Sequence, residues 1–303
     1  MTNTFSGTAS AAASPETQTF KSKDELADYI LKQLRAPDEG IPSQKRADNI
    51  SKTLQERSVN YLRLYSENKI NAEEAEILAE ALKNNSTLKT LILSFSEIGD
   101  EGAEALANAI EGNSMLERLA LNYCAIGGEG AKALAKVLNT TKITYLNLSE
   151  NFINDEGFQA LAELFKENTT ITEIKLDDQE SFCTQGIQAF EEPLKQNFTL
   201  TKIKMESALP PAIEAALERN KWLKEGVDKL NKDLPESENI TPEQFAYTIA
   251  ESYMKLQGPS AKPSPEDINQ MLEGVTLEQL KEMEAQVNEP AHVLEEAVVV
   301  TEA

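Results

Sequence analysis

The sequence contains few of the residue types from which most enzyme and metal sites are built. Among its 303 residues there is one histidine, His292, and there are two cysteines, Cys124 and Cys183. Two cysteines exclude a disulfide framework. A single histidine near the C-terminus leaves serine and cysteine nucleophiles without a general base, and there is no cluster of zinc ligands and no phosphate-binding glycine loop. We therefore expect no catalytic residues, no metal site and no cofactor.

Positive charge is also scarce. Lys and Arg total 29 against 51 for Asp and Glu, which gives a net charge of −22. Duplex nucleic acid and anionic membranes bind cationic surfaces, so we expect neither as a partner. No apolar run is as long as the roughly 18 residues that a membrane span needs, and the N-terminus lacks the basic and apolar regions of a signal peptide. These absences predict a cytosolic environment and leave a basic protein partner open.

What the chain does contain is a repeat of about 28 residues between Ser58 and Asn220. Each unit has an alternating apolar pair, typical of a short strand, and the better units continue with a helical A-x-x-L pattern. The pairs are Leu62/Leu64, Leu91/Leu93, Leu119/Leu121, Leu146/Leu148, Ile174/Leu176 and Ile203/Met205. Such a period predicts a solenoid whose units stack to build one core. The expected fold class is α/β, a horseshoe with a parallel concave sheet, convex helices, helical caps and a small α-helical C-terminal region.

The repeat also divides the chain. Residues 1–20 are rich in Ser, Thr and Ala and are expected to be a disordered N-terminus. Two helices within residues 21–57 are expected to cap the open end of the repeat domain, residues 58–220. The period stops after Asn220, and amphipathic patterns predict a separate α-helical region at 221–288. Residues 289–303 are acidic and are expected to form a flexible tail.

The inner face of such a sheet carries the side chains that alternate with the buried apolar positions. Several of these side chains are tyrosine or arginine, residue types that are enriched at binding hot spots. We predict a protein-binding concave patch made of Tyr61, Arg63, Tyr65, Arg118, Tyr123, Tyr145, Asn147 and Lys175. Acidic residues lie mainly on the predicted helices, so we expect a nearly balanced inner face and a negative outer face. The alternative is a soluble inner surface with incidental aromatic residues.

The units follow the template LxxLxLxxN, which resembles the leucine-rich repeat, and their length is similar to that of the ribonuclease-inhibitor class. In that class the ninth side chain bonds to backbone groups in the turn after the strand. Asn151 and Cys124 hold this position with the usual residue types, and the final units depart most from the template. A nucleophilic Cys124, as in bacterial leucine-rich-repeat ubiquitin ligases, is the alternative. Its place in the repeat favours a structural role.

Residues 168–205 resemble the last full repeat of tropomodulins and leiomodins, through an N-T-x-x-x-E-I-K-x-D-x-Q run and an N-x-T-L-x-K restart. Tropomodulins cap actin filaments, so this resemblance implies a tropomodulin-like actin regulator. The layout of repeats, helices and an acidic tail is similar to leucine-rich-repeat effectors that Legionella-type bacteria inject into host cells by type IV secretion. A repeat domain with an acidic tail also resembles the GTPase activator of Ran.

Together these features predict a non-enzymatic scaffold that binds a protein partner, expected to be a host protein, through its concave face. Under the effector interpretation the protein is a virulence factor that moves from a bacterium into the host cytoplasm. Actin regulation and Ran-type GTPase activation are the alternatives. We expect a monomer.

Overall fold

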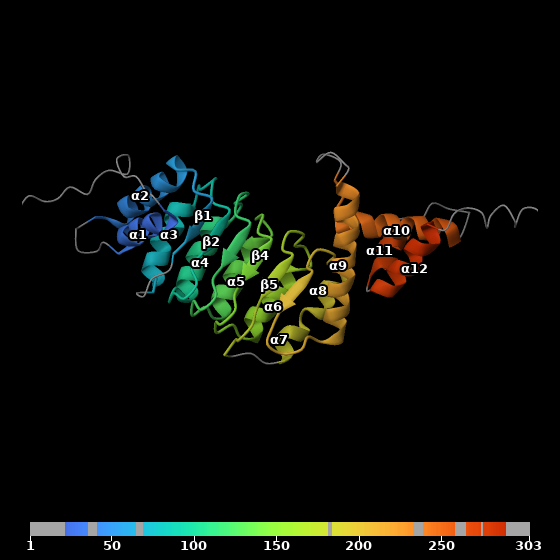
Figure 1. Cartoon of the computed structure of the whole chain (residues 1–303). Coiled ribbons are helices and arrows are strands. Elements are labelled where there is room, and N and C mark those ends of the chain that lie inside the picture. Colours follow the sequence, from blue (N-terminus) through green and yellow to red (C-terminus); the bar gives the residue numbers. More distant parts are fainter. Residues whose placement is uncertain are drawn as a thin grey trace, which may run out of the picture.

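The structure is a computed structural model, and it describes residues 22–35, 41–64, 69–180, 184–232, 239–257, 265–273 and 275–288. The predictions for the N-terminus (1–20) and for the tail (289–303) lie outside these residues, as do Tyr65, Cys183 and His292. The described chain is an arc of stacked strand–helix units with helices covering both ends (Figure 1).

Six strands form one parallel sheet in sequence order. They are β1 (Tyr61–Arg63), β2 (Thr90–Ile92), β3 (Arg118–Ala120), β4 (Tyr145–Asn147), β5 (Glu173–Lys175) and β6 (Lys202–Lys204). The middle residues of neighbouring strands pair with one another and form one buried apolar row: Leu62, Leu91, Leu119, Leu146, Ile174 and Ile203. A slip of one residue would turn this row toward solvent, so burial fixes the register. The predicted α/β solenoid is confirmed.

One helix follows each of the first four strands on the outer side of the arc: α3 (Ala72–Leu82), α4 (Gly99–Ile110), α5 (Gly128–Leu138) and α6 (Asp155–Leu164) (Figure 1). Residues at the predicted A-x-x-L spacing are buried, as at Ala103, Leu106, Ala131 and Leu134. After β5 the outer segment consists of two short helices, α7 (Thr184–Gln188) and α8 (Glu191–Gln196). The late part of the solenoid is therefore less regular than its centre, as the template predicts.

Helices α1 (Lys23–Leu34) and α2 (Ser43–Glu56) cover the N-terminal end of the sheet. The Ser22 side chain caps α1, because its hydroxyl accepts a hydrogen bond from the backbone N–H of Glu25 at 3.2 Å. Leu34, Ile50 and Leu54 are buried in the same core as the first repeats. These helices close an apolar end that stacking alone would leave exposed.

The side chain of the ninth repeat residue forms hydrogen bonds to the backbone of the turn that follows the strand, and Asn151 is the clearest example. Its Nδ2 donates to the carbonyl oxygens of Leu121 and Leu148, both at 2.9 Å. Its Oδ1 accepts from the backbone N–H groups of Cys124 and Ile126, both at 3.0 Å. The side chain therefore joins two neighbouring turns, which is the role that the repeat resemblance implies for position nine.

The predicted boundary at residue 220 falls inside a single helix. Helix α9 (Pro211–Asn231) stands at the end of the sheet, and α10 (Pro242–Gln257), α11 (Pro265–Leu272) and α12 (Leu277–Asn288) lie beyond it (Figure 1). Leu217 packs in the repeat core, whereas Leu223 of the same helix packs in a second core with Ile249 and Leu280. Phe198 of the last repeat also belongs to the second core. The C-terminal helices are therefore packed onto the solenoid.

Arg219 joins the last repeat to the C-terminal helices. Its side chain is buried, and Nη2 donates to the carbonyl oxygens of Leu194 at 2.8 Å and Asn197 at 2.7 Å. Nη1 donates to the carbonyl oxygen of Val275 at 3.4 Å. Burial lowers the pKa of Arg219 to about 10, so the guanidinium stays protonated at neutral pH. One buried cation thus serves backbone acceptors from both parts of the chain.

Candidate functional site

Cys124, the residue considered as a nucleophile, lies inside the repeat core. Its side chain is fully buried, and the thiol donates to the carbonyl oxygen of Leu93 at 3.2 Å. Burial raises the pKa of this thiol to about 12, although a backbone hydrogen bond from Ser96 acts in the opposite direction. Because the thiolate is the reactive form, a thiol held in this way is not a nucleophile at neutral pH. The structure supports the packing role.

Neither a metal site nor a membrane-spanning helix is found among the described residues. Their His, Cys, Asp and Glu side chains form no group of three that suits a metal ion. None of the helices described is long and apolar enough to cross a bilayer. The sequence predicts a contact patch on the inner face of the sheet.

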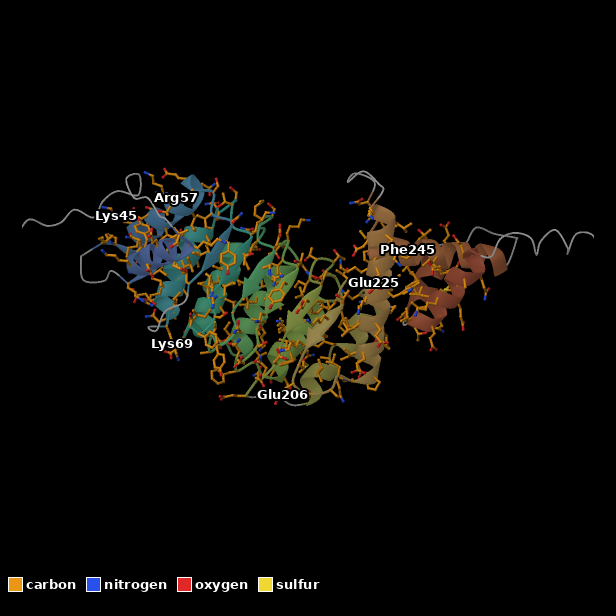
Figure 2. All side chains as sticks on the ribbon, in the orientation of Figure 1. Lys45, Arg57, Lys69, Glu206, Glu225 and Phe245 are labelled. Carbon is orange, nitrogen blue, oxygen red and sulfur yellow. The ribbon has the colours of Figure 1, made fainter. Side chains whose placement is uncertain are left out.

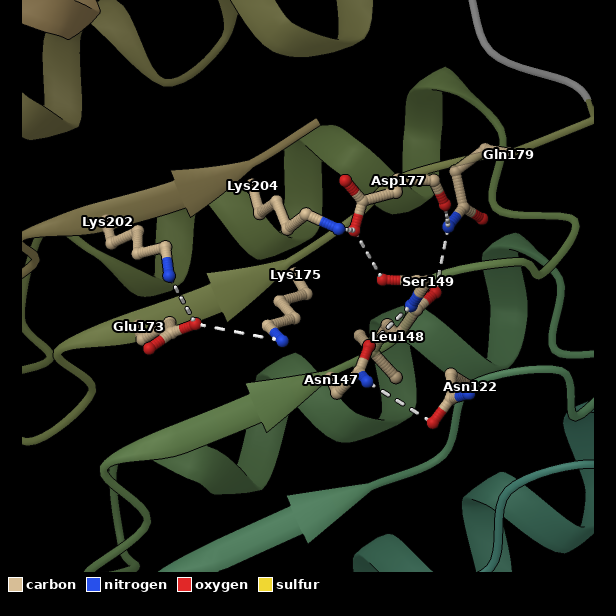
Figure 3. Close-up of polar contacts among 10 residues, drawn as sticks. All are labelled: Asn122, Asn147, Leu148, Ser149, Glu173, Lys175, Asp177, Gln179, Lys202 and Lys204. Carbon is tan, nitrogen blue, oxygen red and sulfur yellow. Dashed lines mark hydrogen bonds and ion pairs between the residues drawn. The ribbon is translucent and has the colours of Figure 1, made fainter. Parts of the chain in front are cut away.

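Polar side chains on this face are joined across strands by hydrogen bonds (Figure 3). Asn122 lies in the centre of one group, and its Oδ1 accepts from Ser94 Oγ at 2.6 Å and from Asn147 Nδ2 at 3.2 Å. The Oδ1 of Asn147 accepts in turn from the backbone N–H of Ser149 at 3.0 Å. These bonds fix side-chain orientation in advance, which reduces the ordering cost of binding.

A second group of contacts connects the last three strands and the turns that follow them. Asp177 Oδ2 accepts from Ser149 Oγ at 2.9 Å and lies 3.3 Å from the Nζ of Lys204. On the same face, Glu173 Oε1 lies 3.0 Å from the Nζ of Lys202 (Figure 3). Carboxylates and amines at this end of the face therefore pair with one another.

Three residues of the predicted patch come together in the middle of the face. The guanidinium carbon of Arg118 lies 3.8 Å from the ring centroid of Tyr145, and the Nζ of Lys175 lies 5.4 Å from the same point. The strand register explains the first contact, because Arg118 and Tyr145 are paired residues on β3 and β4. A cation at this distance is attracted by the ring quadrupole. Arg118, Tyr145, Lys175 and the neighbouring Asn147 are called the cationic patch below.

Tyr61 and Arg63 lie on β1, two strands away from the cationic patch. The Nζ of Lys23, on α1, is 4.4 Å from the Tyr61 ring centroid. Tyr61 and Arg63 line an open pocket of about 540 Å³ between the N-terminal cap and the first strand, together with Lys23, Asp24 and Asp28. The predicted cluster is thus divided into two separate surfaces.

Tyr123 belongs to neither of these surfaces. It lies in the turn after β3 with a φ of 58°, and its ring stacks on that of Phe95 in the preceding turn, with centroids 4.9 Å apart. The sequence reasoning missed Phe95 because this residue follows the alternating inner positions of its unit. The available signal was the spacing, since Phe95 and Tyr123 are 28 positions apart, one repeat.

A family model described as Leucine Rich repeat matches residues 84–107, 112–135 and 140–162. The chain contains leucine-rich repeats. The three matched segments include strands β2, β3 and β4, which are the regular centre of the sheet. Stacked repeats of this kind form extended concave binding surfaces, so the architecture is that of a protein-binding scaffold.

The solved structures similar to this chain include leiomodin-1 actin-binding site 2, with 18% identity and a TM-score of 0.40 over 71% of this chain and 97% of that one. They also include the C-terminal domain of a Caenorhabditis elegans tropomodulin, with 22% identity and a TM-score of 0.46 over 52% of this chain and 98% of that one. Similarity at this level carries no argument about partners. Among curated proteins no significant match is found.

Proposed function

We propose that the repeat domain is a non-enzymatic scaffold that binds a protein through its concave face, with the cationic patch as the main contact. The observation that carries this proposal is the position of Arg118 and Lys175 beside the Tyr145 ring. Arg and Tyr are enriched at binding hot spots. The patch stands on strands whose register is fixed by the buried apolar row, so its side chains are presented on a rigid support.

The charge of the inner face indicates what the partner presents. The inner positions of the described residues hold five cations and three carboxylates, which are Arg63, Arg118, Lys175, Lys202, Lys204, Glu173, Asp177 and Glu206. Lys202 and Lys204 are paired with carboxylates at 3.0 and 3.3 Å, and Lys175 Nζ lies 4.0 Å from Glu173 Oε1, whereas Arg118 is exposed and lies over an aromatic ring. A carboxylate bonds well to the forked donors of arginine. We therefore propose that an acidic side chain of the partner contacts Arg118.

Affinity capture with the full chain as bait tests this proposal. The variant Arg118→Ala/Tyr145→Ala/Lys175→Ala is compared with wild type and with the control Lys132→Ala/Lys166→Ala. The control removes the same amount of positive charge from lysines that pair with Glu129 and Glu163 outside the inner face. We expect a partner that binds wild type and control and is lost with the patch variant. Identical partner sets for the three proteins would show that the patch is not the contact.

Actin is the first named partner to test, because residues 168–205 carry the tropomodulin-like sequence motifs. In a pyrene-actin assay, slowed exchange at the pointed end would support actin regulation, and no effect at micromolar protein would remove it. Stimulated GTP hydrolysis by Ran is the corresponding test of the Ran-type alternative. Comparing the cationic-patch variant with wild type in a positive assay would show whether the concave face makes the contact.

A further inference from the structure

A row of turn residues lies along the carboxyl-terminal edge of the sheet, next to the concave face. The row consists of the eighth residues of four consecutive repeats, Phe95, Tyr123, Glu150 and Asp178. Their φ angles are 62°, 58°, 58° and 53°. Backbone hydrogen bonds of 2.8–3.1 Å connect the turns in order: Phe95 N–H to Asn122 O, Tyr123 N–H to Ser149 O, and Glu150 N–H to Asp177 O. These four residues are called the edge row.

The first half of the edge row is an exposed aromatic pair. Phe95 is 45% exposed and Tyr123 is 49% exposed, although their rings stack on each other. The described residues include four large apolar side chains with this degree of exposure, and three of them lie in turns after β2, β3 and β4: Phe95, Tyr123 and Phe152. Bulky residues rarely adopt a positive φ. The fold thus holds two large rings outward, where they add nothing to the core, as is typical of a contact surface.

The second half of the edge row is acidic. Burial raises the pKa of the Glu150 carboxyl, and the charges of Asp178 and Asp177 raise it further, against a smaller opposing effect of Lys204. Glu206, after β6, extends the acidic half to the end of the sheet, and hydrogen bonding of its protonated carboxyl to Asp178 raises the pKa of Glu206. Figure 2 shows Lys69 and Glu206 toward the two ends of this edge of the solenoid. Lys204 opposes these carboxylates only in part, so the acidic half keeps an excess of negative charge.

We propose that the edge row is a docking surface for a protein segment that carries an apolar residue and an arginine or lysine. The apolar residue covers the rings of Phe95 and Tyr123, and the cation meets Glu150 and Asp178. This surface goes beyond the concave-face contact proposed above, because its charge has the opposite sign and its partner group is basic.

The geometry of the sheet sets the spacing of the two groups. The aromatic pair and the acidic pair are centred two strands apart, which corresponds to roughly 10 Å because neighbouring strands lie about 4.8 Å from each other. An extended chain advances about 3.3 Å per residue, so the cation should follow or precede the apolar residue by about three positions. A segment with the two groups adjacent would not reach both halves of the row.

The test uses random peptides displayed on phage and selected on the full chain. The edge variant Phe95→Asn/Tyr123→Asn/Glu150→Asn/Asp178→Asn serves for counter-selection. Asparagine tolerates a positive φ better than the residues it replaces, so this variant is expected to fold. The control Glu101→Gln/Glu104→Gln/Leu230→Asn makes the same change in charge and replaces a side chain that is 46% exposed on α9.

We expect enriched peptides with an apolar residue and an arginine or lysine about three positions apart. As synthetic peptides they should bind wild type and control equally, and bind the edge variant at least about tenfold more weakly. Absence of enrichment would overturn the proposal. Peptides that bind the edge variant within about twofold of wild type would also overturn it. The same holds for peptides whose binding to the control variant is weakened as much as their binding to the edge variant, since net charge would then explain the binding.

Discussion

Replacing Arg219 with methionine is expected to loosen the C-terminal helices from the repeat domain. Methionine retains most of the apolar length of the side chain and has no hydrogen-bond donor. The guanidinium donates to the carbonyl oxygens of Leu194, Lys195 and Asn197 at 2.8, 3.1 and 2.7 Å. These carbonyls lie at the end of α8, where the last C=O groups of a helix have no partner within it. The carbonyl of Asn197 keeps a bond from Asn220 Nδ2 at 2.8 Å. The substitution therefore leaves three acceptors without their donor at a buried junction: the carbonyl oxygens of Leu194 and Lys195, and Asn220 Oδ1, which accepts from Arg219 Nε at 3.0 Å.

The size of the effect follows from two opposing terms. A buried acceptor without a donor costs about 1–3 kcal/mol, so three acceptors cost about 6 kcal/mol. Part of this is recovered, because the buried guanidinium is itself unfavourable. The lowering of its pKa from 12.5 to about 10 corresponds to about 3 kcal/mol. The expected decrease in the free energy of unfolding is about 3 kcal/mol, comparable with the breaking of other buried charge networks.

Urea unfolding with two probes measures this decrease. Trp222 is the only tryptophan of the chain, and its ring centroid lies 6.2 Å from that of Phe245, where α9 meets α10. Its fluorescence therefore reports on the C-terminal core, whereas far-UV circular dichroism reports on the whole chain. Arg219→Met should move the fluorescence midpoint to lower urea more than the dichroism midpoint. Lys221→Met, an exposed neighbour on α9, is the control, and equal fluorescence midpoints for the two variants would refute the role assigned to Arg219.

Three further outcomes are expected. Cys124 should resist alkylation by iodoacetamide in the folded protein and react in urea, as read by peptide mass spectrometry, because burial raises its pKa to about 12. Gly157→Ala should lower the free energy of unfolding by about 1–3 kcal/mol, because its Cβ would lie 2.6 Å from Ile153 Cγ2. A hydrogen bond with Asp178 raises the pKa of Glu206, so the native state binds this proton more tightly than the unfolded chain does. The contribution of Glu206 to the free energy of unfolding should therefore increase as the pH falls toward 4.5. In thermal melts at several pH values, Glu206→Gln should lack this pH-dependent contribution. Alkylation of Cys124 in the folded protein would contradict the first expectation. Unchanged stability of Gly157→Ala would contradict the second, and an unchanged pH profile of Glu206→Gln would contradict the third.

The sheet was predictable because each unit buries the same apolar pair against copies of itself. Burial of Leu91 and Leu119 depends on neighbouring units alone, so a pattern within one repeat determines the register. The junction at α9 was not predictable in this way. Arg219 and Asn220 are polar, and a pattern of apolar residues assigns such positions to the surface. These two side chains can be buried because they donate hydrogen bonds to backbone carbonyl oxygens of the last repeat. For example, Asn220 Nδ2 donates to the carbonyl oxygen of Leu200 at 2.8 Å.

The two proposed surfaces show the same limit. Alternation along a strand correctly places Arg118 and Tyr145 on one face, where their side chains meet. Alternation ends with the strand, however, and each strand here has three residues. Tyr123 lies beyond that end, and its positive φ directs the chain into the turn, so it belongs to the edge row. A rule for strands cannot place a residue with a left-handed backbone.

The prediction of a translocated effector depends on the layout of repeats, helices and acidic tail. The prediction of a secretion signal depends on the Glu-rich C-terminus, whose residues 289–303 lie outside the described residues. They stay predictions. Binding by the repeat domain does not depend on them, because the cationic patch and the edge row are built entirely from residues 95–178.

The two surfaces differ in how the charge of the whole chain acts on a partner. A net charge of −22 attracts a basic segment from a distance, and the edge row adds local carboxylates of the same sign. An acidic group approaching the cationic patch is repelled at long range and attracted by Arg118 and Lys175 at short range. The contact proposed for the edge row therefore favours fast association, and the one proposed for the patch favours selection among partners that are already close. A partner that uses both surfaces must carry a basic segment and an acidic one, which is a stricter requirement than either surface imposes alone.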